Sequence, residues 1–332
     1  MAEAAEDYGD FIRRAAKAVR DARPGMESLV RDAAIARGAA KYNYPRDHVA
    51  QELDAEIDAQ KPIGDVTKEH VSKLLERELE RMQNPQHGIA TPFRLLNYLI
   101  VGGFQAGELI YLGARPAVGK SAMALDFARE AAKRGKRVLV VSREMHGLAI
   151  ARRLLAQEGK LNASRLRTGS EDMADVAAVA ERLSALPIWI TDSAASLADI
   201  EAMAESIDFL IVDYLQLVRA PDAIKERRLQ VEHTSSGLKA LALKLAIPVL
   251  CLSSLARPRE GNPEPTLASF RESGEIEHDA DVALLLHRMN PNEPEVTCIV
   301  AKNRDGETGR VKLRFVAEWV SFHQVDESYV EL

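Results

Sequence analysis

One short stretch restricts the fold of this chain more than any other. The apolar run 108–112 leads into Gly113-Ala114-Arg115-Pro116-Ala117-Val118-Gly119-Lys120-Ser121, and an amphipathic stretch continues to residue 134. A loop of this kind, between a buried strand and a helix, wraps backbone N–H groups around nucleotide phosphates, and its Lys and Ser add an ammonium and a hydroxyl that can hold Mg²⁺. The usual pattern has glycine where this chain has Ala114. The flanking strand and helix favour a nucleotide site over a chance Gly-Lys-Ser in a surface turn.

Two other apolar runs end in acidic residues that suit such a site. The run 207–213 ends in Asp213, as expected of a buried strand that delivers a carboxylate to the water shell of Mg²⁺. The run before Glu144 predicts a strand next to the phosphate-loop strand, with the carboxylate placed to orient and polarise an attacking water. Taken alone, either acid fits a strand that simply ends at a turn or at the surface.

Apolar runs alternate with amphipathic stretches beyond residue 88. Strands are expected at residues 108–112, 137–141, 188–190, 209–212, 248–252 and 282–286. Stretches such as 121–134 and 229–245 have helical character between them. The alternation predicts an α/β fold with a mainly parallel central sheet flanked by helices.

The C-terminal part has a different strand pattern. Three closely spaced apolar runs, 296–302, 311–316 and 321–325, have the turn residues Asp305-Gly306 between the first two. They predict a β-hairpin or meander that closes one edge of the sheet.

The first 85 or so residues are rich in Ala, Arg, Asp and Glu. Apolar residues recur there at helical spacing, as in Val49, Leu53 and Ile57, which predicts three or four short helices. Breaks are expected near Pro24-Gly25, Tyr44-Pro45 and Pro62-Ile63-Gly64. The expected domains are a small helical segment (1–66), a linker helix with the boundary (67–87) and the α/β domain (88–332).

Composition limits the partners and the compartment. The chain has 44 Lys and Arg against 50 Asp and Glu, and the net charge of −6 excludes a globally basic nucleic-acid coat but not a local basic channel. Cys251 and Cys298 lie in apolar runs, so they are expected to be buried thiols in a reducing compartment. The sequence has no run of roughly 18 apolar residues and no signal-peptide pattern at its start. A cytoplasmic protein without a membrane partner is expected.

Several ordered motifs between residues 88 and 325 carry a resemblance to a known family. They are Gly102-Gly103-Phe104-Gln105-Ala106-Gly107-Glu108-Leu109-Ile110, Gly113-Ala114-Arg115-Pro116 with Gly119-Lys120-Ser121, Ser142-Arg143-Glu144-Met145, Arg165-Leu166-Arg167-Thr168-Gly169, Asp213-Tyr214-Leu215-Gln216-Leu217, Arg271-Glu272-Ser273-Gly274 with Ile276-Glu277 and Asp279-Ala280-Asp281, and Ala301-Lys302-Asn303-Arg304 with Thr308-Gly309. These motifs resemble the motor domain of DnaB-type replicative helicases, a RecA-like P-loop NTPase fold that forms hexameric rings on single-stranded DNA. In that family Ala before Arg-Pro is usual, so Ala114 fits the pattern.

The resemblance implies roles for the residues of the nucleotide site. Lys120 and Ser121 would bind the β- and γ-phosphates of ATP and Mg²⁺. Asp213 would hold the water shell of the metal, and Glu144 would be the catalytic base. The nucleotide-contacting residues would be Ala114, Arg115, Pro116, Ala117, Val118, Gly119, Lys120, Ser121 and Gln216.

The same resemblance implies that the catalytic site is shared between subunits. Lys302 and Arg304, on the C-terminal hairpin, would reach the γ-phosphate held by a neighbouring subunit. An arginine finger of this kind contributes ~10³–10⁵ in rate. Hydrolysis would then require assembly into a ring, expected to be a hexamer. Without the other motifs, Arg304 would be interpreted as a solvated cation at a hairpin tip.

The loop Phe270–Gly274 resembles the family's DNA-binding loop, which faces the ring channel. Arg271 would contact phosphate, Glu272 belongs to the same motif, and Gly274 would let backbone N–H groups approach the strand. Such contacts do not read sequence, so binding should be salt-sensitive and sequence-tolerant. A mobile surface loop of mixed charge is the alternative. DNA contact would thus be confined to an inward-facing loop, leaving an acidic exterior.

Two features depart from the family pattern. Ser254 stands where the family has a Gln that couples the nucleotide state to the DNA loops, so coupling would be weaker or rerouted, for example through Gln216. Residues 1–85 also lack similarity to the family's larger N-terminal domain, which engages primase. Only the helix at about 68–83 lies where the family's linker helix packs on the adjacent subunit, and its apolar stripe fits an intramolecular core equally well.

The expected function is that of an ATP-dependent, ring-forming DNA helicase or translocase that acts on single-stranded DNA during replication. The alternatives are a helicase-like ATP-binding regulator or loader that does not unwind DNA, and a RecA-like recombination ATPase. The expected partners are single-stranded DNA and further copies of the chain, with a loader, primase or other replisome protein as candidates for residues 1–85. Either a bacterium or a phage or plasmid in a bacterial host would fit as the source.

Overall fold

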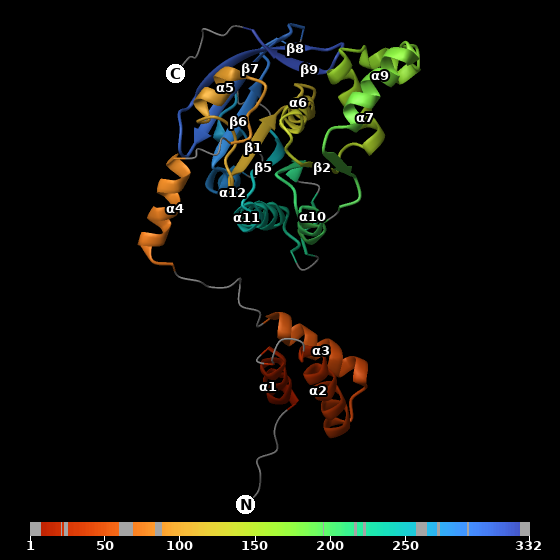
Figure 1. The fold of residues 1–332 in the computed structure, drawn as a ribbon, viewed down its shortest axis with the longest axis vertical. Helices are drawn as coiled ribbons and strands as arrows, with labels where there is room; N and C mark the ends of the chain where they lie inside the picture. The colour runs from red at the N-terminus through yellow and green to blue at the C-terminus, as the bar shows by residue number, and fades with distance from the viewer. Residues whose placement is uncertain are drawn as a thin grey trace, which may run out of the picture. The chain divides into compact units, whose positions relative to one another are not determined.

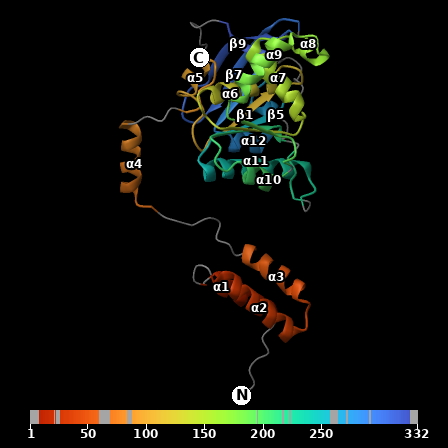
Figure 2. The same ribbon diagram turned by 45° about the vertical axis from the view of Figure 1, so that its right-hand side comes forward.

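The computed structural model describes residues 8–20, 22, 26–59, 69–83, 88–194, 196–215, 218–221, 224–256, 264–270, 273–290 and 292–325. The chain divides into two compact units, Met1–Pro85 and Gln86–Leu332. Figures 1 and 2 show both units. In the described parts of the chain, no helix is long and apolar enough to cross a membrane.

The first unit is helical, as the periodicity predicted. Helices α1 (Tyr8–Arg20), α2 (Glu27–Tyr42) and α3 (Arg46–Ala59) pack on one another. The chain leaves α2 through Asn43 in the left-handed conformation (φ +57°), just before Pro45. The buried apolar core of the three helices consists of Phe11, Ile12, Ala15, Ala16, Ile35, Val49 and Leu53.

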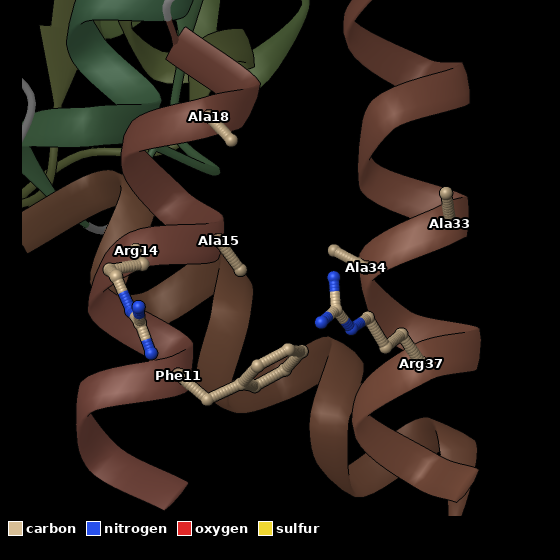
Figure 3. Close-up of a pocket in the computed structure, with 7 residues that line it drawn as sticks. All are labelled: Phe11, Arg14, Ala15, Ala18, Ala33, Ala34 and Arg37. Carbon is tan, nitrogen blue, oxygen red and sulfur yellow. The ribbon is translucent and has the colours of Figure 1, made fainter. Parts of the chain in front are cut away.

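An open groove of about 340 Å³ lies between α1 and α2. It is lined by Phe11, Arg14, Ala15, Ala18, Ala33, Ala34 and Arg37. In Figure 3 the Phe11 ring points from α1 toward α2, and the guanidinium of Arg37 lies in the gap between the two helices. The small alanines leave this space open, and the arginines make it basic.

Helix α4 (Val71–Gln83) has an apolar stripe whose side chains are exposed. The exposed residues of the stripe are Val71, Leu74, Leu75, Leu79 and Met82. Their spacing of three and four residues places them on one helix face.

The second unit is built on a nine-stranded sheet with the order β3-β2-β4-β5-β1-β6-β7-β8-β9. The strands are β1 (Leu109–Ala114), β2 (Val138–Ser142), β3 (Ile188–Thr191), β4 (Phe209–Asp213), β5 (Val249–Ser254), β6 (Val282–His287), β7 (Glu295–Asn303), β8 (Gly309–Val316) and β9 (Ser321–Gln324). The first six in chain order pair in parallel, and β6 to β9 form an antiparallel meander. The predicted α/β class and C-terminal hairpin are confirmed.

Helices cover both faces of the parallel strands (Figure 1). They are α5 (Arg94–Leu99), α6 (Lys120–Lys133), α7 (Gly147–Gly159), α8 (Ala163–Thr168), α9 (Met173–Ser184), α10 (Leu197–Met203), α11 (Arg227–Leu245) and α12 (Ser273–Asp279). Alternate residues of β1 belong to separate cores: Ile110 and Leu112 pack with residues of α5, α6 and α7, whereas Leu109 and Tyr111 pack with residues of α10, α11 and α12. A strand buried on both faces must be apolar throughout, which explains the continuous runs in the sequence.

Two expectations about placement are wrong. The strand before Glu144 is β2, and β4 and β5 separate it from β1. The crossover through α6 carries the chain past positions that later strands fill, so sequence order does not give sheet order. Three residues of the expected loop 270–274 also lie in other structure: Phe270 is buried in a bridge with Leu255, and Ser273 and Gly274 belong to α12.

A buried carboxylate joins the phosphate-loop helix to the edge of the sheet. Asp126 on α6 accepts hydrogen bonds from the Phe322 backbone N–H (2.8 Å) and the Ser321 hydroxyl (2.8 Å) of β9. We expect Asp126→Ala to lower the free energy of unfolding by about 2–3 kcal/mol, because two buried donors lose their acceptor. Urea unfolding measures the effect, and Asp126→Asn, which keeps one acceptor oxygen, should lose less. Equal stability of the parent and Asp126→Ala would contradict this account.

Candidate nucleotide-binding site

A cavity of about 390 Å³ opens at the carboxyl end of β1. This is the edge of a parallel sheet at which ligands bind in α/β folds. The cavity is lined by Ala114, Arg115, Pro116, Ala117, Gly119, Lys120, Ser121, Ala122, Glu144, Met145, Arg153, Ser254, Phe315 and Val320. Seven of the eight predicted phosphate-loop residues are therefore at the cavity, and the catalytic candidates Lys120 and Glu144 are there too.

The conformation of the phosphate loop depends on its glycine. Gly119 has φ +112°, and a Cβ there would lie 2.7 Å from the Phe322 ring of β9. Ala117 also has a positive φ (+64°), which brings the backbone into the tight curve of the loop. The eighth loop residue, Val118, does not line the cavity, because its side chain packs against the core.

Ser121 and Asp213 meet as the sequence predicted for a metal-binding pair. The Ser121 hydroxyl donates to Asp213 Oδ2 at 2.6 Å. The other oxygen, Oδ1, is buried and has no hydrogen-bond partner among the described residues. Burial raises the pKa of Asp213, while Ser121 and Lys120 oppose the rise. A hydroxyl and a carboxylate with a spare buried oxygen are suitable ligands for Mg²⁺.

Lys120 is a cation whose charge acts on Asp213. Burial lowers the pKa of Lys120, and the charges of Asp213 and Glu144 oppose that shift. Its ammonium lies 4.7 Å from the centroid of the Tyr214 ring, which gives it a cation–π contact. The lysine is therefore held at the cavity by β4 and the residue that follows it.

Glu144 reaches the cavity although β2 is not adjacent to β1. The loop after β2 is fixed by the Arg143 backbone N–H, which donates to the Asp213 carbonyl at 2.6 Å. The Glu144 side chain is exposed and lines the cavity. All the parallel strands end at one edge of the sheet, so separated strands still contribute to one site.

Sequence reasoning missed three cavity residues that are distant along the chain. Arg153 on α7 is half-buried, and the pKa of its guanidinium is lowered by burial and raised by Asp213 and Glu144. Phe315 and Val320, at the turn between β8 and β9, form an apolar wall. No local pattern marks these residues, because only the sheet order brings them to the phosphate loop.

Lys302 and Arg304 lie near the amino end of the parallel strands, whereas the cavity opens at their carboxyl end. Asn303 at the end of β7 pairs with Val282, which pairs with Ile110 near the start of β1. Ile110 is four residues from Ala114, a distance of about 13 Å along a strand. Neither cation lines the cavity.

Gly274, predicted to contact DNA, does not line the cavity. Gly274 is an exposed residue in the first turn of α12, with nothing within 4 Å of an added Cβ, so it occupies a helix where a loop was expected. Gln216, Arg271 and Glu272 lie outside the described residues. Both cysteines are free and buried, as expected.

Glu108, just before β1, gives the second unit a pH dependence. Burial raises the pKa of Glu108 to about 7, and nearby Asp281 and Asp305 add to the rise. A raised carboxyl pKa means that the folded state binds the proton more tightly than the unfolded state does, so the contribution of Glu108 to stability is greatest below pH 4.5 and is lost as the pH rises through 7. We expect Glu108→Gln to be more stable than the parent at pH 8 by about 1 kcal/mol, after discounting for solvent screening, and equal to it at pH 4.5.

Urea unfolding at the two pH values checks the pH dependence of Glu108. Glu205→Gln, which neutralises an exposed glutamate, is the matched control. An equal gain for both variants at pH 8 would contradict the assignment of the effect to the buried carboxyl.

A mainly parallel sheet with a phosphate loop after a central strand, and acids after two other strands, defines a P-loop domain of the RecA-like class. The chain belongs to the family described as DnaB-like helicase C terminal domain, whose sequence model matches residues 88–324. The replicative DNA helicase DnaB of Treponema pallidum (strain Nichols) is 40% identical over 253 residues, which cover 73% of this chain and 57% of that protein. Replicative DNA helicase DnaB of Geobacillus stearothermophilus is 36% identical over 264 residues, covering 74% of this chain and 58% of that protein. The chain thus spans little more than half the length of these relatives.

Solved structures of related proteins are also similar to this chain. One of them, described as an ATPase domain, has a TM-score of 0.72 and 27% identity, and the match covers 78% of this chain and all of that one. A DnaB-like replicative helicase, whose structure was described with its interactions with primase, has a TM-score of 0.70 and 25% identity over 92% of this chain and 81% of that one.

Proposed function

We propose that this protein is an ATP-hydrolysing, ring-forming DNA helicase or translocase that acts on single-stranded DNA during replication. One observation carries the proposal. The cavity gathers the phosphate loop with Ser121 and Glu144, and Asp213 accepts a hydrogen bond from Ser121. Lys302 and Arg304 lie at the opposite, amino end of the parallel strands. A site completed by those two cations needs a second copy of the chain.

The polar groups at the cavity have proposed tasks in ATP hydrolysis. Loop N–H groups and Lys120 bind the β- and γ-phosphates, since a helix N-terminus and an ammonium both favour anions. Arg153, which lines the same cavity, adds a further cation on the subunit's own side. Glu144 accepts a proton from the attacking water and orients it toward the γ-phosphorus.

Mg²⁺ is the proposed cofactor, with Ser121 and Asp213 as its protein side. No group of three or more His, Cys, Asp and Glu side chains in the described residues could hold a metal by itself. That fits Mg²⁺, which binds through one or two protein oxygens together with nucleotide phosphates and water. The ion, when bound, neutralises charge that develops on the phosphate oxygens.

The DNA contacts are proposed for Arg271, Glu272 and Gly274. Exposed Gly274, which has no side chain, lies in the first turn of α12, where its backbone N–H can approach a phosphate closely. Because such contacts are to the backbone, binding should weaken steeply with added salt. A net charge of −6 then requires the cationic contact to be local.

Residues 1–85 are the proposed attachment for other proteins. We assign the exposed stripe of α4 to the adjacent subunit of the ring, in the manner of the family's linker helix. A loader, primase or other replisome protein would bind the three-helix part, where the basic groove between α1 and α2 is open. The protein would work in the cytoplasm of a bacterium, or be carried by a phage or plasmid there, where buried thiols stay reduced.

The test is an ATPase assay together with electron-microscope imaging of the purified protein, with and without single-stranded DNA. Rings with DNA-stimulated turnover are expected, and displacement of a strand from a forked duplex should follow. ATP binding without turnover would overturn the proposal in favour of a helicase-like regulator. Strand exchange without unwinding would favour a recombination ATPase.

A further inference from the structure

The two cations proposed to act on a neighbouring subunit are held, within their own subunit, by one short segment, Glu277–Asp281. Lys302 Nζ donates to the backbone carbonyl of Glu277 at 2.7 Å, at the end of α12. Arg304 Nη1 donates to Asp281 Oδ1 at 3.0 Å. The Arg304 backbone N–H also donates to the Asp281 carbonyl at 2.9 Å.

Asp281 is buried and is fixed in place by several hydrogen bonds. Its side chain is 5% exposed, and its second oxygen, Oδ2, accepts from the Leu109 backbone N–H (2.8 Å) and from Lys239 Nζ (2.5 Å). The Asp281 backbone N–H donates to the Leu109 carbonyl at 2.9 Å. The carboxylate is therefore bound at once to β1, to α11 and to the residue after β7, and it cannot shift without breaking buried hydrogen bonds.

The Arg304 guanidinium is bonded to protein on one side and exposed to solvent on the other. Its side chain is 67% exposed, although Nη1 is bonded to the buried carboxylate. A guanidinium has five N–H donors in one plane, so a single bond to Asp281 leaves donors for a phosphate on the outer side. An exposed arginine without such an anchor would lose more rotamer freedom on meeting its target.

We propose that Asp281 is a positioning residue for Arg304, and that it fixes the guanidinium in the orientation in which it meets the neighbouring subunit's γ-phosphate. The inference rests on the proposed function, in which Arg304 completes that neighbouring site. Asp281 acts through Arg304 and does not itself reach the phosphates, because it lies at the amino end of the parallel strands. The nearby Asp279 is a natural comparison, since its carboxylate accepts from Ser235 and Ser236 and holds neither cation.

The first experiment compares Asp281→Asn with Asp279→Asn in rings of the full chain. Asn keeps the size of Asp but not its charge. We expect kcat for ATP to fall about 10–100-fold in Asp281→Asn, with KM changed less than about twofold, because the subunit's own phosphate site is intact. Asp279→Asn should keep the parental kcat. A parental kcat in assembled Asp281→Asn would overturn the inference.

The second experiment separates an effect on the neighbour from damage to the subunit's own site. Asp281→Asn protein is mixed with Lys120→Ala protein, which lacks phosphate binding but has an intact Arg304. Mixed rings should hydrolyse ATP faster than either protein alone, because an intact finger then faces an intact phosphate loop. No gain would mean that the Asp281 defect lies in its own subunit, and the inference would be wrong.

Arg304→Ala mixed with Lys120→Ala distinguishes this failure from that of the proposed function. Without rescue in that mixture, Arg304 does not act in trans and the proposed function fails at that point. With rescue there but none for Asp281→Asn, only the positioning role fails. If Asp281→Asn does not assemble, Asp281→Glu replaces it, and its defect should disappear in the Arg304→Ala background, where no finger remains to be positioned.

Discussion

Glu144→Gln is expected to reduce ATP turnover strongly and to leave ATP binding unchanged. Gln has nearly the same shape as Glu but cannot accept the proton of the attacking water. A positioned general base contributes about 10²–10⁴-fold, so kcat should fall by that factor. Single-turnover hydrolysis measures the loss, and equilibrium binding of ATP measures what is retained.

The matched control for Glu144 is Glu181→Gln, a substitution of an exposed glutamate on α9 that does not line the cavity. It should hydrolyse ATP at the parental rate. Turnover of Glu144→Gln at that same rate would mean that another group activates the water, and the position of Glu144 at the cavity would then need a different explanation.

Arg304→Ala is expected to reduce DNA-stimulated turnover to the basal level, while the protein still assembles. The alanine removes the cation that we assign to the neighbouring γ-phosphate, and an arginine finger contributes ~10³–10⁵ in rate. Arg304 is mostly exposed in its own subunit, and Asp281 keeps its bonds to Leu109 and Lys239 without it, so the loss of Arg304 should leave the fold intact. ATPase assays with single-stranded DNA and imaging of the assembly measure the two properties together.

Arg314→Ala provides the control for Arg304, because Arg314 is another exposed arginine of the same meander, on β8. It should retain DNA-stimulated turnover. Undiminished turnover in Arg304→Ala would exclude the shared active site. Loss of assembly in Arg304→Ala would instead assign the residue a structural role at the interface.

Much of the fold could be predicted because its signals are local. Strands of the parallel sheet are buried on both faces, so each appears as a continuous apolar run, and β1, β4 and β6 begin and end within two residues of the expected positions. The phosphate loop was found from residue type and spacing, since glycine is required where φ is positive and a Cβ would meet Phe322. The order of the strands had no such local signal. The prediction that β2 lies next to β1 was wrong, because β4 and β5 lie between them.

The candidate site was predicted only as far as its local motifs extend. Ser121 and Asp213 could be paired in advance, because a phosphate loop requires a metal-side carboxylate from another strand end. Arg153, Phe315 and Val320 could not be found in this way, since their place at the cavity follows from how α7 and the β8–β9 turn pack on the sheet.

The amino-acid sequence by itself determined the α/β class, the phosphate loop, and the acids that approach it, because each follows from residue type and short-range periodicity. Only the tertiary structure decided at which end of the parallel strands each functional side chain lies. It places Lys302 and Arg304 away from the cavity and anchors Arg304 on buried Asp281. The physical reason is that β7 runs antiparallel to β6, so its carboxyl end returns to the amino end of the parallel strands, a direction that depends on long-range pairing.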